Sequence, residues 1–198
     1  MNNFFQKDYE IPNESNYMRL EEGDNTFRIL GTFSDGSCIM GTQYWKTHQD
    51  GKRAPVRLKM GKTVSPHELG LNPQSGEPET LKHFWAMPVY NYTAKKVQIL
   101  EITQKSIQFY IKKMAENPKW GDPREYDFIV TKTKENGRTS YTISTNPKEK
   151  LDLGIMKLYR DMDMHIEAMY EGLDPFNYTP KEDRINIDDL PDDLGEAA

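Results

Sequence analysis

The chain has 198 residues, 36% of them hydrophobic, and a formal net charge of −5; this fits one folded domain with polar extensions, and no apolar run predicts a membrane helix or a signal peptide. The single cysteine, Cys38, excludes an internal disulfide and indicates a reducing compartment. Residues 26–150 carry 20 Lys and Arg against 12 Asp and Glu, whereas residues 1–25 carry 2 against 6 and residues 151–198 carry 4 against 13, so a basic body that attracts polyanions lies between acidic ends.

The first strands are predicted by β-branched and aromatic residues. Residues 26–30 and 38–46 form two such runs, and the turn residues 34–37 between them predict a hairpin. Residues 54–59 are expected to form a short strand, which Pro55 restricts to the edge of a sheet.

A long loop and a second hairpin follow. Residues 60–81 contain three glycines and three prolines, and a loop of this length is often functional. Residues 83–90 and 97–102 are rich in strand-forming side chains and are joined by a turn at residues 94–95, so we expect them to pair.

The apolar period changes from that of a strand to that of a helix after residue 102. Apolar residues recur at i, i+3, i+4 and i+7, which predicts a helix capped by Thr103 and ended by Asn117 and Pro118. The residues on its apolar face are Ile107, Tyr110, Ile111 and Met114.

A third hairpin and a second helix are predicted in the last part of the basic body. Residues 126–132 and 139–144 flank an Asn-Gly pair at 136–137, which is a hairpin-turn signal. Asn146 and Pro147 then resemble a helix cap and a first helical residue.

This order of elements predicts a mainly β protein with α-helices, of the α+β class. Short strands with one helix before the last hairpin favour an OB-fold-like five-stranded barrel with one inserted helix, a further hairpin and a C-terminal helix. We expect an acidic N-terminal arm at residues 1–25, the OB-fold-like domain at 26–170, and an acidic, disordered C-terminal tail at 171–198.

Basic and aromatic residues are interleaved along the predicted strands. Lysines and arginines bind phosphates and release counterions, and aromatic faces stack on unpaired bases, so this pattern predicts a surface for single-stranded nucleic acid. Neighbours in a strand point to opposite faces, so at least one of Phe84 and Trp85 is expected in the core. The candidate stacking residues are Trp45, Phe84, Trp85 and Tyr90, and the candidate phosphate contacts are Lys46, Lys52, Arg53, Arg57, Lys59 and Lys82.

Other chemistries find little support in the sequence. The Gly-Lys-Thr triplet at 61–63 lacks the glycine five residues earlier that a phosphate-binding loop requires. Cys38 and the histidines are not spaced as metal ligands. We therefore predict no catalytic residue, no metal and no cofactor.

Two alternatives of other classes stay open. Asp122, Glu125 and Asp127 could hold Mg²⁺ for a nuclease or another DNA-processing enzyme, although aspartates here also suit a turn. In the second alternative the aromatic residues form the core of a protein–protein adaptor that binds no nucleic acid.

The predicted tail alternates acidic and apolar residues. Such a composition is typical of disordered segments that partner proteins bind, and the same charges could occupy the basic surface when nucleic acid is absent. The candidate partner contacts are Asp188, Asp189, Asp192 and Asp193.

With these residues in view, the chain resembles the helix-destabilising single-stranded DNA-binding proteins of tailed bacteriophages. The resemblance covers residues 26–150 and the tail, and it implies an OB-fold barrel that binds and protects single-stranded DNA without sequence preference during replication or recombination in the host cytoplasm. It also implies an acidic tail that contacts replication proteins. The chain departs from some members in having too few cysteines for a zinc ribbon and an acidic rather than basic N-terminal arm. The segments that carry the resemblance are 27–30, 44–45, 82–92, 97–103, 120–123, 126–128 and 140–143.

Overall fold

The computed structural model describes residues 15–48 and 50–180. Within these residues an eight-stranded sheet is accompanied by α-helices and short 3-10 helices, which confirms the predicted mainly β, α+β class. The strands are β1 (Tyr17–Met18), β2 (Gly23–Ile29), β3 (Ile39–Thr47), β4 (Arg53–Lys59), β5 (Lys82–Asn91), β6 (Lys96–Ile102), β7 (Asp127–Glu135) and β8 (Arg138–Thr145). The helices are α1 (Lys105–Ala115), α2 (Leu153–Asp161), η1 (Pro66–Glu68), η2 (Pro123–Glu125) and η3 (Ile166–Glu171).

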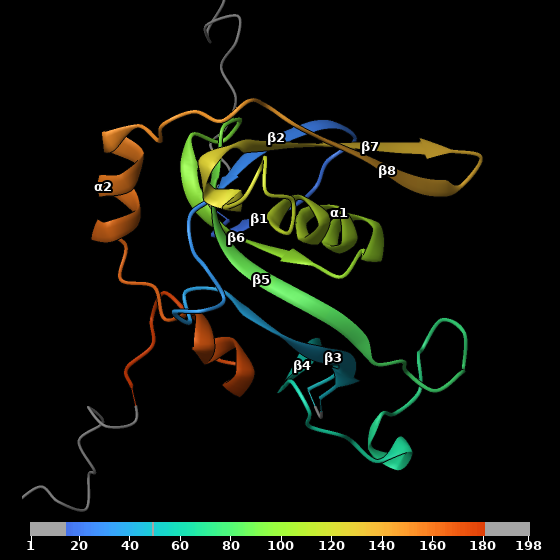
Figure 1. Ribbon diagram of the computed structural model, residues 1–198. Coiled ribbons are helices and arrows are strands. Elements are labelled where there is room, and N and C mark those ends of the chain that lie inside the picture. Colours follow the sequence, from blue (N-terminus) through green and yellow to red (C-terminus); the bar gives the residue numbers. More distant parts are fainter. Residues whose placement is uncertain (1–14, 49, 181–198) are drawn as a thin grey trace, which may run out of the picture.

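Strand β5 organises the sheet because three strands pair with it. The main path is β1-β6-β5-β2-β7-β8, with β3 also pairing with β5 and β4 pairing with β3. β2 and β3 share one edge of β5, since Ile29 lies opposite Val89 and Ile39 lies opposite Ala86. The β3–β4 hairpin therefore extends from the far end of β5, away from β7 and β8 (Figure 1).

The pairing of residues 26–30 with 38–46 is the one predicted hairpin that is wrong. Both segments pair with β5 instead of with each other, because β5 is ten residues long and offers each of them a separate stretch of its edge. The β5–β6 and β7–β8 hairpins form as predicted. Asn136 and Gly137 both have positive φ, as their turn requires.

Helix α1 lies in the curve of the sheet, between β7–β8 and β5–β6 (Figure 1). Its predicted apolar face is confirmed, since Ile107, Ile111 and Met114 are buried in a core cluster with Phe27 and Phe128. The predicted Thr103 cap is wrong. The residue at the cap position is Gln104, and its side chain does not cap the helix.

A second core cluster covers the opposite face of β5 and β6. There Phe84 and Ile99 pack against Ile166 and Met169 of η3. The phenol of Tyr170 donates a hydrogen bond of 2.8 Å to the carbonyl of Met40, which ties η3 to β3. Both faces of β5 are consequently covered by helical segments.

The single C-terminal helix predicted from Pro147 is replaced by α2 and η3. Residues 146–149 are held in extended backbone beside η2 and β7, because the amides of Asn146 and Glu149 donate to the carbonyls of Asp127 and Glu125. Asp152 caps α2 through its carboxylate, which accepts from the amides of the first turn.

Both predicted domain boundaries fall inside structural elements. Residue 25 lies within β2, and residue 170 lies within η3. Tyr17 in β1 and Phe176 after η3 make an edge-to-face ring contact at 6.5 Å, so segments assigned to the arm and tail pack together. The remainder of the predicted arm and tail, including Asp188, Asp189, Asp192 and Asp193, lies outside the described residues.

Residues 17–20 lie between β6 and the β7–β8 hairpin. β1 runs parallel to β6, and the ammonium of Lys132 in β7 donates to the carbonyl of Leu20 at 2.7 Å. In the described part of the chain no ladder joins β8 directly to β6. The N-terminal segment thus bridges the gap between the two ends of the curved sheet.

Candidate nucleic-acid interface

The β3–β4 hairpin places aromatic and basic side chains on one face. Residues opposite each other in an antiparallel pair share a face, so the register decides which side chains meet. Gly41 allows the two strands to approach, because a Cβ there would lie 2.0 Å from the carbonyl oxygen of Leu58. The face that carries Trp45 consists of the pairs Gly41–Lys59, Gln43–Arg57, Trp45–Pro55 and Thr47–Arg53.

Trp45 is the predicted stacking residue that the fold exposes. Its side chain is 41% exposed, and the guanidinium of Arg53 lies over its ring at 5.6 Å from the centroid. A cation held over an indole face is attracted by the ring and limits how the side chain can move. Part of the indole ring of Trp45 is therefore exposed to solvent beside the positive charge of Arg53.

The two predicted arginines are each held by a glutamate. Arg53 makes an ion pair with Glu79, which comes from the end of the long loop after β4. Arg57 makes an ion pair of 2.6 Å with Glu101 of β6, and Gln43 donates to the same carboxylate at 2.9 Å. These contacts fix the hairpin and the loop to the body of the sheet.

The predicted lysines surround this face but do not all lie on it. Lys46, Lys52, Lys59 and Lys82 are exposed. Lys46 points to the opposite face of the hairpin because it is paired with Ala54, and the ammonium of Lys59 lies 5.5 Å from the ring centroid of Tyr170. The hairpin therefore carries positive charge on both faces and at its edge.

Phe84 and Trp85 are both buried, which argues against the stacking role predicted for each of them. Phe84 is fully buried beneath η3, and Trp85 is 9% exposed in the core on the α1 side. The indole N–H of Trp85 donates to Nε2 of His83 at 3.0 Å. Strand alternation correctly separates the two rings, but the opposite face of β5 is covered as well.

Tyr90 lies at the other end of β5 from the hairpin. It is half-buried, pairs with Arg28 of β2, and makes an edge-to-face contact with Tyr92 at 5.1 Å. Eight residues of strand separate it from Lys82, a span of about 26 Å. The structure thus brings the hairpin residues together but leaves Tyr90 apart from them.

Sequence reasoning missed the acidic partners of the arginines. Glu101 lies between the apolar residues Leu100 and Ile102 of β6, and a charged residue at such a position needs a partner, so its position contained a signal. Glu79 lies in the punctuated loop, where no spacing links it to Arg53. That contact depends on the path of the loop in three dimensions.

The three carboxylates of the nuclease alternative are separated into different ion pairs. Asp122 binds Arg124 at 2.6 Å, Glu125 binds Lys148 at 2.6 Å, and Asp127 binds the buried Arg28 at 2.5 Å. Hydrogen bonds from Arg124 hold the pKa of Asp122 below its usual value. Across residues 15–48 and 50–180 no group of three or more His, Cys, Asp or Glu side chains is arranged to hold a metal ion.

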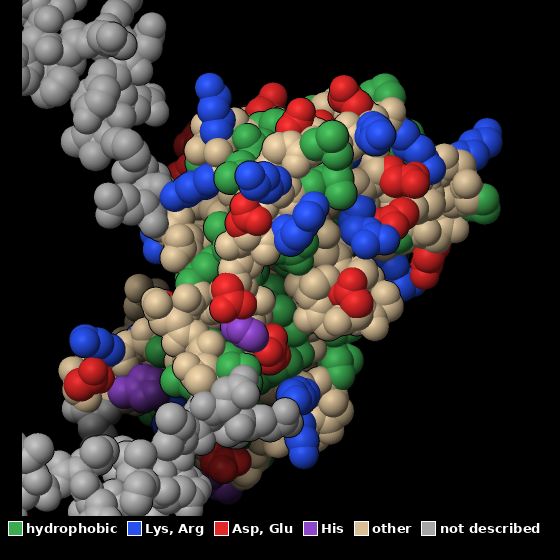
Figure 2. Space-filling view, turned by 90° about the vertical axis from the view of Figure 1, so that its left-hand side faces the viewer, with side chains coloured by type: hydrophobic (Ala, Val, Ile, Leu, Met, Phe, Trp, Pro, Cys, Tyr) green, Lys and Arg blue, Asp and Glu red, His purple; other side chains and the backbone are tan. Residues whose placement is uncertain are grey.

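The surface around α2 has mixed charge. Figure 2 shows this side of the molecule, where Lys and Arg side chains alternate with Asp and Glu and with hydrophobic side chains. The exposed hydrophobic residues of α2 include Leu153 and Leu158.

The sequence matches no protein-family model and no curated protein. Among the described helices, none is long and apolar enough to cross a membrane. The candidate interface therefore rests on the arrangement of its own residues.

Proposed function

We propose that this protein binds and protects single-stranded DNA without sequence preference, in bacteriophage replication or recombination. The observation that carries the proposal is the exposed Trp45 ring with the Arg53 guanidinium 5.6 Å from its centroid, on a hairpin bordered by exposed lysines. An indole face binds any base by stacking, and the cations bind the phosphates on either side. No catalytic step is part of this function.

The strand ladders support an OB-fold-like arrangement as part of the proposal. An OB fold is a five-stranded, partly open barrel whose second and third strands and the loop after the first strand bind oligonucleotides. Here β2 pairs with β5 and β7, β5 pairs with β6, β7 pairs with β8, and α1 lies between β6 and β7. In this assignment the β3–β4 hairpin is an insertion between the first and second barrel strands, where the fold commonly binds its ligand.

The glutamates make binding an exchange of anions. Glu79 and Glu101 neutralise Arg53 and Arg57 in the free protein, so a phosphate must compete with a carboxylate for each guanidinium. The exposed lysines are held less tightly, since Lys52 makes only a long ion pair of 3.8 Å with the exposed Asp50. We expect them to supply the first contacts, with the arginines engaging the strand afterwards.

The test is a titration of dye-labelled oligothymidylate, followed by the fluorescence anisotropy of the dye, at about 50 and about 200 mM salt. We expect Trp45→Ala to weaken binding by about 1–3 kcal/mol, which is the contribution of one stacked base. Phe109→Ala is the matched control, because Phe109 is a 68% exposed aromatic residue on α1, away from the hairpin. Equal affinities for wild type and Trp45→Ala, or affinity that is independent of salt, would overturn the proposal.

The other two classes predict different results in the same experiment. A nuclease would shorten a labelled oligonucleotide when Mg²⁺ is added. An adaptor would leave the anisotropy of the labelled oligonucleotide unchanged. Contacts of replication proteins with Asp188, Asp189, Asp192 and Asp193 stay a proposal for the tail.

A further inference from the structure

An apolar cavity of about 600 Å³ lies on the α1 side of the sheet, where β5 faces the C-terminal half of α1. Its size is within the range of small-molecule sites. Phe33 and Trp85 meet edge to face in its wall at 5.4 Å. Sulfur-containing side chains supply much of the remaining wall, namely Cys38, Met40, Met60 and Met87.

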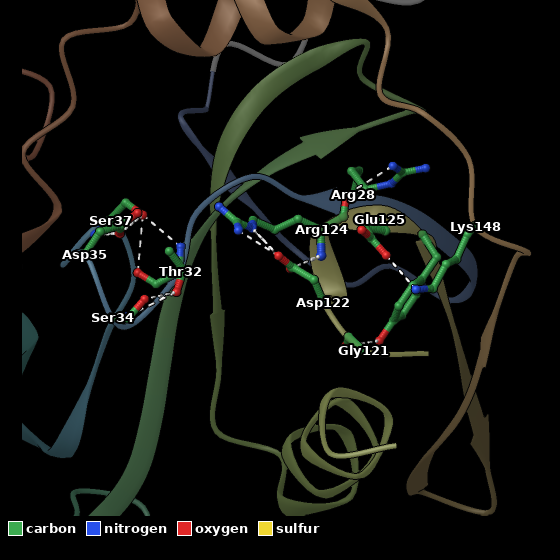
Figure 3. Close-up of polar contacts among 11 residues, drawn as sticks. Arg28, Thr32, Ser34, Asp35, Ser37, Gly121, Asp122, Arg124, Glu125 and Lys148 are labelled. Carbon is green, nitrogen blue, oxygen red and sulfur yellow. Dashed lines mark hydrogen bonds and ion pairs between the residues drawn. The ribbon is translucent and has the colours of Figure 1, made fainter. Parts of the chain in front are cut away.

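The polar groups of this cavity gather at one side. Lys112 of α1 and Arg124 of η2 line it together with a single carboxylate, Asp122. Asp122 binds Arg124 through both of its oxygens, at 2.6 to 3.1 Å. In Figure 3 the guanidinium of Arg124 extends from η2 toward the loop that carries Thr32 and Ser37. The charged lining thus has two cations, and each has a carboxylate partner: Arg124 binds Asp122, and Lys112 binds Glu116 on the next turn of α1 at 2.5 Å.

The loop opposite Arg124 is held in place by its own hydrogen bonds. The carboxylate of Asp35 accepts from the amide and the hydroxyl of Ser37, and Ser37 accepts from the amide of Thr32 (Figure 3). His83 is similarly fixed, since its Nε2 accepts the indole N–H of Trp85, which leaves the N–H of the neutral ring on Nδ1. The cavity is therefore bounded by ordered side chains.

We propose that this cavity binds one nucleobase, with the attached phosphate at Lys112 and Arg124. A flat ring suits walls made of an aromatic pair and polarisable sulfur atoms, which favour ring contacts. A phosphate on that ring would replace Glu116 and Asp122 as the hydrogen-bond acceptor of these two cations. The ligand is a free nucleotide or a base extruded from a bound strand.

This site is distinct from the hairpin face. Trp85 and Phe84 point to opposite sides of β5, and Arg57 of the hairpin lies over Phe84 at 5.9 Å on the side away from the cavity. Met40 of β3 and Met60 after β4 line the cavity, but the hairpin face that carries Trp45 does not, so a free nucleotide could bind without contacting that face. The inference goes beyond the proposed function and can fail or succeed independently of it.

The reporter is the full chain with Trp45→Phe and Trp120→Phe, because Trp85 is then the remaining tryptophan of the three. We expect dAMP and dTMP to change its fluorescence in a saturable way, and inorganic phosphate to have no effect at the same concentrations. Lys112→Ala should weaken nucleotide binding about tenfold, as the loss of one charge-assisted contact predicts. Lys113→Ala is the matched control, since Lys113 is an exposed neighbour on α1 that does not line the cavity.

A blocking variant separates the cavity from the hairpin. Ala115 is an exposed lining residue at the end of α1, so Ala115→Phe should abolish binding of dAMP while the protein still unfolds cooperatively. Oligothymidylate that displaces dAMP identifies a strand as the source of the base, and failure to displace it identifies a free nucleotide. Absence of saturable binding at millimolar nucleotide would overturn the inference, as would saturable binding of an acidic aromatic peptide alone. If the protein binds dAMP but does not bind oligothymidylate, only the proposed function is overturned.

Discussion

The β3–β4 hairpin and the body that holds α1 contain the same kinds of side chain in opposite environments. In the hairpin, Trp45 is 41% exposed and carries Arg53 over its ring. In the body, Phe84 is fully buried, and the Arg28 side chain is 2% exposed and bonded to Asp127. An exposed ring and cation can engage a ligand, whereas a buried pair contributes to the fold. Residue type alone therefore does not identify an interface.

Arg28 in the body and Arg53 in the hairpin show the same contrast between buried and exposed environments. Arg28 donates to Asp127 and to the carbonyls of Arg124 and Glu149, at 2.5, 3.2 and 3.0 Å. It ties β2 to β7, to η2 and to the extended segment before α2. Arg53 joins the hairpin to the long loop through Glu79 and keeps part of its side chain in solvent. The first arginine connects core elements, and the second connects peripheral ones.

The largest expected effect is on stability, in the variant Arg28→Ala. Removing this cation leaves Asp127 buried without its ion-pair partner, which costs about 3–5 kcal/mol of unfolding free energy. Lys46→Ala, at an exposed hairpin position, should change stability by no more than about 0.5 kcal/mol. Denaturant unfolding measures both variants. Equal losses would contradict the distinction between body and hairpin.

Phe84→Ala is expected to cost about 3–5 kcal/mol as well, because it removes a buried ring and leaves a cavity beneath η3. Trp45→Ala should cost less than about 1 kcal/mol, since its ring is partly exposed. The comparison uses the same unfolding measurement at a fixed temperature. A Phe84→Ala protein as stable as wild type would show that η3 does not pack firmly on β5.

Glu79→Gln tests whether carboxylates compete with phosphates in the hairpin. Removing the negative charge beside Arg53 should tighten binding to oligothymidylate by about three- to tenfold, or about 0.7–1.4 kcal/mol. Glu77→Gln is the matched control, because Glu77 is an exposed neighbour in the same loop. Weaker binding of the Glu79 variant would mean that the ion pair is needed to hold the hairpin in place.

A smaller effect is expected in the salt dependence of binding. Lys82→Ala should reduce the slope of log affinity against log salt concentration by about 0.7, the value for one phosphate contact to a single strand. Lys157→Ala, an exposed lysine on α2, should leave the slope unchanged. If both variants alter the slope equally, the effect comes from net charge and not from a contact at the hairpin.

The smallest effect concerns alkaline pH and the body alone. Burial raises the pKa of Tyr92 to about 12, with the neighbouring Asp127 adding to the shift, and burial raises the pKa of Tyr126 to about 12. Their unfolded pKa is about 10, so the stability they contribute is present below about pH 10 and is lost as pH rises toward about 12. Urea midpoints at pH values across this window should fall less in the double variant Tyr92→Phe, Tyr126→Phe than in wild type. Parallel curves would contradict the assignment.

Much of the fold could be predicted from local patterns. The α1 face, the β5–β6 hairpin and the Asn136-Gly137 turn follow from the spacing of a few residues. The C-terminal helix could not be predicted in this way, because the amides of residues 146 and 149 bond to carbonyls near the start of β7. When distant hydrogen-bond partners override a local helix propensity, the sequence of the segment alone does not show it.

The candidate site shows the same division between features that local patterns predict and features that depend on tertiary packing. Trp45 and the four lysines, predicted as base and phosphate contacts, are exposed, and their binding role stays a prediction. The burial of Phe84 was not predicted, because it depends on η3 returning to cover the second face of β5. The sequence indicates which side chains could bind, and the packing decides which remain accessible.

By itself, the sequence determined the basic body with acidic ends, the α+β class, and most individual strands with their turns. These depend on composition and on contacts between near neighbours. Only the tertiary structure decided that β2 and β3 share one edge of β5, that Glu79 and Glu101 hold the hairpin arginines, and that a sulfur-rich cavity forms beside α1. The physical reason is that these features join residues far apart in the chain, and their free energy appears only after the sheet has assembled.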